Sequence, residues 1–165
     1  MSNTDSNDRC KHLKSSIGFE LRVQDVMTSN VITVQKYENI MPVAKILSEK
    51  NISGLPVVDK ENHVIGMITQ ADILCMIGVR KEHTFKDLLR HMLGEQLPES
   101  KTGDIVADIM VSPVVTIRPD MNIAEATQLM DEKRIRRLVV VDDKNVLVGI
   151  ISRADILKAV LSKLQ

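Results

Sequence analysis

Short apolar runs alternate along the chain with longer segments in which the apolar residues are periodic. The runs at 31–34 and 114–117 consist of Val, Ile and Thr, which predicts two short strands. After each run, mostly apolar residues recur at i, i+3, i+4 and i+7, the spacing of one helix face. We therefore expect an amphipathic helix after each strand, with Asn39 and Asn122 as the N-cap residues.

A pair of closely spaced β-rich runs follows each of these helices. Asp and Asn residues separate the two runs of each pair, which predicts hairpins over 55–68 and 138–151. A second helix is then expected to start at Thr69 and at Ser152, directly after the two hairpins. Each half of the chain thus has the predicted order strand, helix, strand, strand, helix.

The two halves are copies of one another. At an offset of 83 residues, the separation of Met27 and Met110, 22 of the 52 aligned positions in 23–74 and 106–157 are identical without a gap. This pattern indicates an internal duplication, and a copy of about 50 residues is too small to be stable alone. We expect an α+β fold in which two β-α-β-β-α repeats pack sheet to sheet with pseudo-two-fold symmetry.

Four segments follow from this duplication and from the composition of the remaining residues. Residues 1–16 are polar, which predicts a mobile N-terminal tail, and 17–78 form the first repeat. Residues 79–104 form a connector with a capped short helix at 85–93, and 105–165 form the second repeat.

Composition and charge exclude several classes of protein. The 22 Lys and Arg residues balance 22 Asp and Glu residues, and only 2% of residues are aromatic, so a nucleic-acid partner is not expected. No apolar run approaches the ~20 residues of a membrane span, and no signal peptide opens the chain. Two cysteines are too few for a disulfide scaffold. We expect a cytoplasmic protein without a membrane partner.

Motifs typical of catalysis and of metal binding are missing from the sequence. The seven glycines form neither a G-x-G-x-x-G pattern nor a Walker loop, and the four histidines include no H-x-x-x-H spacing. No G-x-S-x-G motif is present, and Cys75 has no histidine close to it in the sequence. We therefore expect no enzyme activity, no catalytic residues, no metal ligands and no required cofactor.

One motif does recur, at 66–72 and at 149–155. Its pattern is Gly, two apolar residues, Thr or Ser, any residue, Ala and Asp. A hydroxyl at the N-cap with an acid three residues later is a capping arrangement, which is the simplest interpretation. The alternative is that the same carboxylate and hydroxyl contact a ligand.

Two arginines distinguish the second copy from the first. Arg136 and Arg137 stand directly before an apolar strand, where the first copy has Ser53 and Gly54. The strand itself does not need them. They form either part of a phosphate site or a solvated edge, in which a salt bridge to the acidic residues at 131–132 is one possibility.

These motifs resemble the tandem cystathionine β-synthase (CBS) domain family, the Bateman module. The first copy carries Asp-Val-Met-Thr at 25–28 and Gly-Leu-Pro-Val-Val-Asp at 54–59, and the second carries Arg-Leu-Val-Val-Val-Asp at 137–142. The resemblance implies two clefts between the repeats, each able to hold AMP, ADP, ATP or S-adenosylmethionine. It also implies that the motif Asp binds the ribose hydroxyls and that the Thr or Ser hydroxyl lies near ribose or phosphate.

The resemblance assigns residues of both copies to each cleft. Cleft A is lined by Ser29, Val34, Ile52, Ser53, Arg136, Arg137, Ser152 and Asp155. Cleft B is lined by Gly54, Thr69, Asp72, Ser112, Ile117 and Ile135. Because the arginine pair lies at cleft A, we expect cleft A to be the better nucleotide site and cleft B to be empty, weaker or adapted to a less charged ligand.

The sequence therefore predicts a regulatory module that binds an adenosine-containing ligand without catalysis. The alternative is a dimerising structural or interaction module with vestigial clefts. No catalytic or transport domain is recognisable, so its output is expected to pass to an unidentified downstream protein. A homodimer is expected because apolar helix residues remain uncovered. These residues are Met41, Ile46, Leu74, Ile77, Leu157, Val160 and Leu161.

Overall fold

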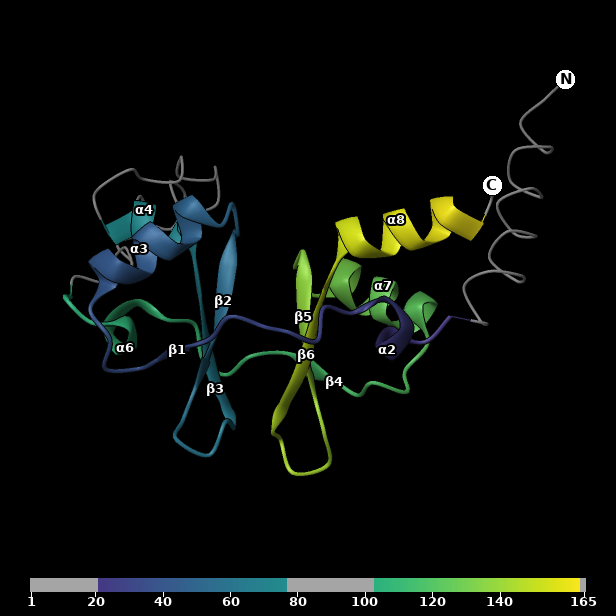
Figure 1. Cartoon of the computed structure of the whole chain (residues 1–165), viewed down its shortest axis with the longest axis horizontal. Coiled ribbons are helices and arrows are strands. Elements are labelled where there is room, and N and C mark those ends of the chain that lie inside the picture. Colours follow the sequence, from purple (N-terminus) through teal and green to yellow (C-terminus); the bar gives the residue numbers. More distant parts are fainter. Residues whose placement is uncertain (1–20, 77–102, 164–165) are drawn as a thin grey trace, which may run out of the picture. The chain divides into compact units, whose positions relative to one another are not determined.

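The computed structural model describes residues 21–76 and 103–163 of the chain (Figure 1). The predicted tail at 1–16, the connector helix at 85–93 and Ile77 lie outside the described residues. The first repeat contains α2 (Val23–Val26), β1 (Val34–Gln35), α3 (Ile40–Glu49), β2 (Gly54–Val58), β3 (Val64–Thr69) and α4 (Gln70–Met76). The second repeat contains α6 (Val106–Ile109), β4 (Thr116–Ile117), α7 (Ile123–Glu132), β5 (Arg137–Val141), β6 (Leu147–Ser152) and α8 (Arg153–Lys163).

The predicted α+β class and the β-α-β-β-α order are confirmed in both repeats. The strands of the two hairpins begin and end within one residue of the predicted runs. The leading strands β1 and β4 have two residues each, shorter than the predicted runs, and β1 begins only at the last residue of the run at 31–34. In the first repeat, Thr28, which precedes β1, pairs with β6: its backbone exchanges hydrogen bonds of 2.8 and 3.0 Å with that of Ile150.

Each repeat contributes one three-stranded sheet, in the order β1-β2-β3 or β4-β5-β6. The leading strand is parallel to the next one, with Val34 opposite Val57 and Ile117 opposite Val140. A parallel pair needs a crossover connection, which α3 and α7 provide. Strands β5 and β6 are antiparallel neighbours with a register shift between Val140 and Val141.

The two crossover helices begin at the predicted asparagines but are capped differently. The side chain of Asn122 accepts a hydrogen bond of 2.8 Å from the backbone N–H of Glu125. Asn39 is also the N-cap residue of its helix, yet its side chain makes no capping bond. The third helical residue there is Pro42, which has no N–H to donate, so the equivalent bond is impossible.

Two compact units divide the chain, and they do not coincide with the two repeats. Of the described residues, unit 1 combines those at 21–31, 61–64 and 115–163. Unit 2 combines those at 32–60, 65–76 and 103–114. The repeats therefore exchange their leading helices: α2 belongs with α8 and β6, and α6 belongs with α4 (Figure 1). The repeat boundaries at 17–78 and 105–165 stay a prediction.

Backbone hydrogen bonds attach each exchanged helix in an equivalent way. In unit 1 the N–H of Val23 donates to the carbonyl of Met121 at 2.8 Å. In unit 2 the N–H of Val106 donates to the carbonyl of Glu38 at 2.9 Å. Neither helix was predicted, since four residues carry too little periodicity to be recognised.

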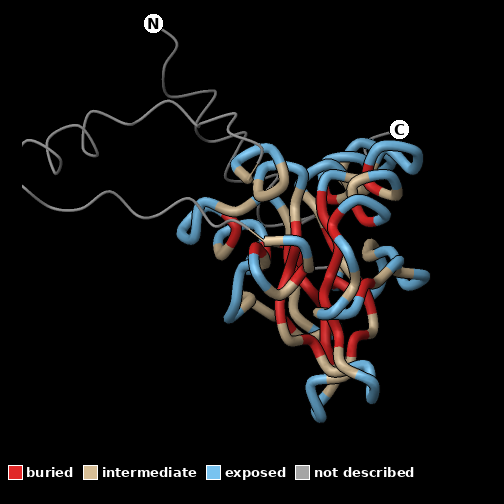
Figure 2. The backbone as a smooth tube through the Cα atoms, turned by 90° about the vertical axis from the view of Figure 1, so that its left-hand side faces the viewer, coloured by how far each residue is buried: buried red, intermediate tan, exposed pale blue. Residues whose placement is uncertain are grey.

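The exchanged helices also complete the two hydrophobic cores, whose buried residues are red in Figure 2. Val23 is fully buried among residues of the second repeat, which include Met130 and Leu138. Val106 and Ile109 are buried among residues of the first repeat. Each core therefore depends on side chains from both copies.

The tip of the first hairpin also belongs to unit 1. Asn62 and Asn145 both have positive φ, 66° and 63°, a conformation that Asn tolerates in a turn. The N–H of Leu147 donates to the carbonyl of Asn62 at 3.0 Å, and the N–H of Val64 donates to the carbonyl of Asn145 at 3.2 Å. This reciprocal pair fixes the turn residues of unit 1 to one another.

Asp142 shapes the turn of the second hairpin. Its Oδ1 accepts the backbone N–H groups of Val146 and Lys144, both at 2.9 Å. The hydrogen bond from Val146, followed by that from Lys144, holds the pKa of Asp142 below its ordinary value. The predicted turn chemistry of an Asp in this hairpin is confirmed.

Two glycines allow the exchanged segments to approach the sheets. A Cβ on Gly149 would collide with the Met27 side chain, with Cγ at 3.0 Å, and would lie 3.2 Å from the carbonyl oxygen of Thr28. A Cβ on Gly66 would meet Met110 and the carbonyl of Val111 in the same way. A side chain at either position would push the exchanged segment away from its sheet.

We predict that Gly149→Val lowers the free energy of unfolding by about 1–3 kcal/mol, the usual cost of overpacking. Urea denaturation measures this change.

Gly103→Ala is no suitable control because its Cβ would also collide, with Asp108. Met27→Ala combined with Gly149→Ala is the informative pair, since removing the thioether should recover part of the loss caused by Gly149→Ala alone. Equal stability of Gly149→Val and wild type would contradict the proposed close approach.

Candidate functional site

The recurring motif forms a reciprocal hydrogen-bonded pair at the start of α8. Oδ2 of Asp155 accepts the backbone N–H of Ser152 at 2.8 Å and its hydroxyl at 2.6 Å. The N–H of Asp155 lies 3.2 Å from Oγ of Ser152. These are the bonds of a capping box, so that interpretation of the motif is confirmed. Both bonds that Ser152 donates to Asp155 reach the same carboxylate oxygen, Oδ2.

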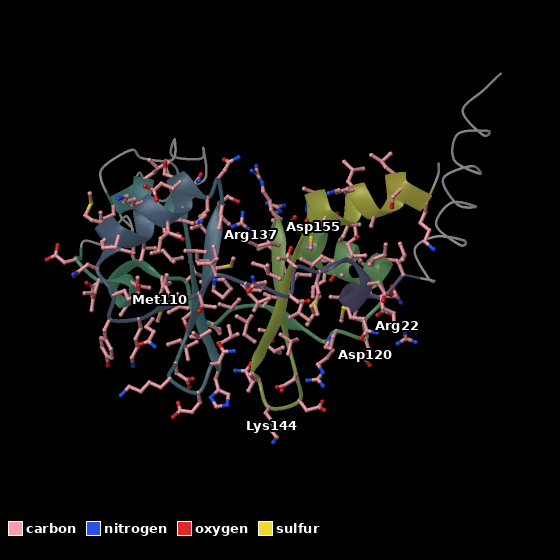
Figure 3. All side chains as sticks on the ribbon, in the orientation of Figure 1. Arg22, Met110, Asp120, Arg137, Lys144 and Asp155 are labelled. Atoms are coloured by element: carbon pink, nitrogen blue, oxygen red, sulfur yellow. The ribbon has the colours of Figure 1, made fainter. Side chains whose placement is uncertain are left out.

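Arg137 stands directly opposite Ser152 in the antiparallel ladder of β5 and β6. Directly opposed residues project to the same face of a sheet. The N–H of Arg153 donates to the carbonyl of Arg136 at 3.1 Å, which ties the start of α8 to the start of β5. Arg137 and Asp155 lie at the same end of this sheet in Figure 3. Unit 1 thus brings together Arg136, Arg137, Ser152 and Asp155, which we call half-site 1.

The electrostatic environment of half-site 1 is that of two adjacent cations. Arg137 is partly buried, whereas Arg136 is exposed. Burial, and then the neighbouring charge of Arg136, lower the pKa of Arg137 from its ordinary value. A guanidinium remains charged at neutral pH despite such a shift. The half-site therefore has a positive charge that is only partly solvated.

The two acidic side chains at 131–132 each contact a described residue other than Arg136 and Arg137. Asp131 lies 3.5 Å from the guanidinium of Arg153, which also donates to the carbonyl of Met130 at 3.2 Å. Glu132 accepts a hydrogen bond of 2.7 Å from the side chain of Gln128. Arg153, the variable residue of the motif, thus contacts α7. The sequence alone did not distinguish it from the other arginines.

Unit 2 contains the equivalent arrangement without the two arginines. It consists of Ser53, Gly54, Thr69 and Asp72, which we call half-site 2. Oδ2 of Asp72 accepts the N–H of Thr69 at 2.8 Å and its hydroxyl at 2.6 Å. The N–H of Gln70 donates to the carbonyl of Ser53 at 3.1 Å. Gly54 is buried at the start of β2, and Ser53 before it is exposed.

The remaining residues predicted for the clefts have varied surroundings. Val34 and Ile117 are only 1% and 3% exposed, so their side chains belong to the cores and a ligand could reach only their backbone. The Ser112 hydroxyl donates to the carbonyl of Ile65 at 2.9 Å, and Ser29 is exposed. Ile52 and Ile135, both half-buried, pack against the cores, and the composition of clefts A and B stays a prediction.

One group of possible metal ligands occurs within the described ranges, in the turn after β2. Ligand atoms of Asp59, Glu61 and His63 all lie within 4.8 Å of one another. The second repeat has Asp142, Lys144 and Val146 in their place, so the group is not duplicated. The group precedes β3, whereas Thr69 and Asp72 of the motif lie at the far end of β3 and in α4, so it belongs to neither half-site.

Comparison with known proteins identifies the duplicated unit. The family model of the CBS domain matches residues 23–79 and 106–162. An uncharacterized protein of Methanocaldococcus jannaschii, MJ1404, is 35% identical over 155 residues, which cover 94% of this chain. The chain spans only 35% of that relative's length.

Solved structures of CBS-domain pairs are similar to this chain. CBSX2 of Arabidopsis thaliana, in a complex with AMP, is 27% identical with a TM-score of 0.71, covering 87% of this chain and 98% of that one. The CBS domain pair of protein MJ0100, in a complex with 5′-methylthioadenosine and S-adenosyl-L-methionine, is 28% identical with a TM-score of 0.66 and the same coverages, 87% and 98%. Among the described residues, no helix has the length and apolar character that crossing a membrane requires.

We predict that Ser152→Ala lowers the free energy of unfolding by about 0.5–2 kcal/mol, because it removes both hydroxyl bonds of the helix cap. Ser152→Thr is the matched control, since the first repeat has Thr69 at the equivalent position and makes the same bonds. Urea denaturation of the three proteins measures the difference. If Ser152→Ala were as stable as Ser152→Thr, the hydroxyl bonds would not stabilise the fold.

Proposed function

The chain belongs to the CBS-domain family, and from that premise we propose that it is a regulatory module that binds an adenosine-containing ligand without catalysing a reaction on it. The observation that carries this proposal is the duplicated carboxylate. Asp72 and Asp155 are each held by a hydroxyl and an N–H through Oδ2 alone. A carboxylate fixed in this way has its other oxygen available for the two hydroxyls of a ribose.

Each half-site would use its residues in distinct roles. Asp155 and Asp72 accept hydrogen bonds from the ribose, and the hydroxyls of Ser152 and Thr69 orient these carboxylates. The complexes of CBSX2 with AMP and of MJ0100 with two adenosine thioethers support adenosine as the common part of the ligand.

The regulatory output would be a change in shape or assembly that a downstream protein recognises. Because each core contains a helix from the other repeat, a ligand that tightens one half-site also affects residues of both copies. The downstream partner and the cytoplasmic location stay predictions.

A second candidate function is a dimerising interaction module, and the exposed apolar residues favour it. Leu157 and Leu161 lie one turn apart on α8 and are 60% and 53% exposed. Met41 on α3 and Leu74 on α4 are 75% and 45% exposed. Val160 and Ile46, also expected on this surface, instead pack against the cores. A homodimer through such helix surfaces is compatible with ligand binding as well.

We predict that AMP, ATP, S-adenosylmethionine or 5′-methylthioadenosine raises the melting temperature, and that GTP at the same concentration does not. At 100 times its Kd a ligand stabilises the native state by about 2.7 kcal/mol, which is a shift of a few degrees. The double variant Asp155→Asn, Asp72→Asn should show no shift in melting temperature, because it loses the charged acceptors for the ribose. Asn keeps an oxygen that can cap the helix. Asp120→Asn, on an exposed loop, is the control. Calorimetry without heat from any adenosine compound would favour the interaction module.

We further predict that the chain is a dimer at high micromolar concentration and that Leu157→Glu with Leu161→Glu makes it a monomer, since two buried charges disfavour an apolar interface. Sedimentation equilibrium measures the mass. Lys158→Glu, an exposed neighbour on the same helix, should leave the dimer intact. A wild-type chain that sediments as a monomer would contradict the homodimer.

A further inference from the structure

The two half-sites differ in charge within a frame that is otherwise the same. The three hydrogen bonds between hydroxyl residue and aspartate agree within 0.1 Å between the two units. The backbone bond from the next residue to the strand start is 3.1 Å in both. At the strand start, however, half-site 1 has Arg136 and Arg137, whereas half-site 2 has Ser53 and Gly54.

Arg137 is placed to respond to the charge of a ligand. It is paired in the ladder with Ser152, whose hydroxyl holds the Asp155 carboxylate, so Arg137 and the start of α8 lie at the same end of the sheet (Figure 3). Arg137 is partly buried beside Arg136, and two like charges in that position repel each other. Phosphate oxygens match the guanidinium geometry, so a ligand that carries a phosphate suits these two cations.

We propose that the two half-sites select adenosine ligands by charge. Half-site 1 takes a phosphorylated adenosine, with Arg136 and Arg137 on the phosphate and Asp155 on the ribose. Half-site 2 takes an adenosine derivative without phosphate, such as a nucleoside or a thioether. This inference rests on the proposed function, since it presupposes that the aspartates bind ribose.

A third cation, Arg153 inside the motif, serves as a control because its guanidinium has other partners. The guanidinium of Arg153 donates to the carbonyl of Met130 and lies 3.5 Å from Asp131. The first repeat has Gln70 at this position, and its side chain also donates to a backbone carbonyl, that of Ile52, at 3.0 Å. Arg153→Gln therefore removes a charge from the same helix turn without removing the proposed phosphate contacts.

The test is isothermal titration of the full chain with AMP and with adenosine, at low and at high salt. Arg136→Gln with Arg137→Gln should weaken AMP binding about 10- to 100-fold, the effect of losing hydrogen bonds to a charged group, and change adenosine binding less than about twofold. In wild type, salt should weaken AMP binding and not adenosine binding. Arg153→Gln should behave as wild type toward both ligands.

Two further variants assign the selectivity to its half-site. In Asp155→Asn, the remaining binding should favour adenosine or 5′-methylthioadenosine over AMP, and in Asp72→Asn it should favour AMP. Ser53→Arg, which introduces the cation of half-site 1 into half-site 2, should increase AMP affinity in the Asp155→Asn background by about tenfold.

The outcomes separate this inference from the proposed function. If wild type binds neither AMP nor adenosine, both the proposed function and this inference are wrong. If both ligands bind but the double arginine variant loses them equally, or loses neither, charge selection is wrong while the adenosine function stands. A variant with an unfolded circular dichroism spectrum is replaced by Arg137→Gln alone, judged by the same ratio of AMP to adenosine affinity.

Discussion

The hydrophobic cores of this chain depend on a short helix that each repeat supplies to the other. Helices α2 and α6 have four residues each, too few to persist in water, and they are held by backbone bonds and by burial of Val23 and Val106. Their approach requires Gly149 and Gly66, since Met27 and Met110 occupy the space of a side chain. Because neither core is complete without the other copy, the duplication is a condition of stability.

The capping pair links this fold to the proposed function. Its hydroxyl and carboxylate start α8 in one unit and α4 in the other. In the proposed function, the same groups that stabilise the helix also present an oxygen to a ribose. A carboxylate that is already fixed loses little conformational entropy when a ligand binds. For the same reason, substituting Asp155 or Asp72 by Ala perturbs stability and binding together, and Asn separates the two effects better.

The copies differ in charge at a position whose backbone bonds are the same in both. The capping bonds and the sheet registers are conserved by the duplication, as in Val34 opposite Val57 and Ile117 opposite Val140. The starts of β2 and β5 differ, and there a change from Ser53 to Arg136 alters charge without altering the backbone bonds. In the charge selection that we propose, this difference lets one scaffold hold two ligands of different charge.

The sequence by itself determined the repeats, the crossover helices and the hairpins, because periodicity, turn residues and N-caps act over a few neighbouring residues. It also singled out Asp72 and Asp155, although it left their capping role and their ligand role undecided. Only the tertiary structure assigned α2 and α6 to the opposite repeat's core, since contacts between Val23 and Met121 join residues far apart in the chain. Likewise, only the structure showed that Arg153 is bound to α7 while Arg137 faces Ser152, because side-chain partners depend on how distant elements pack.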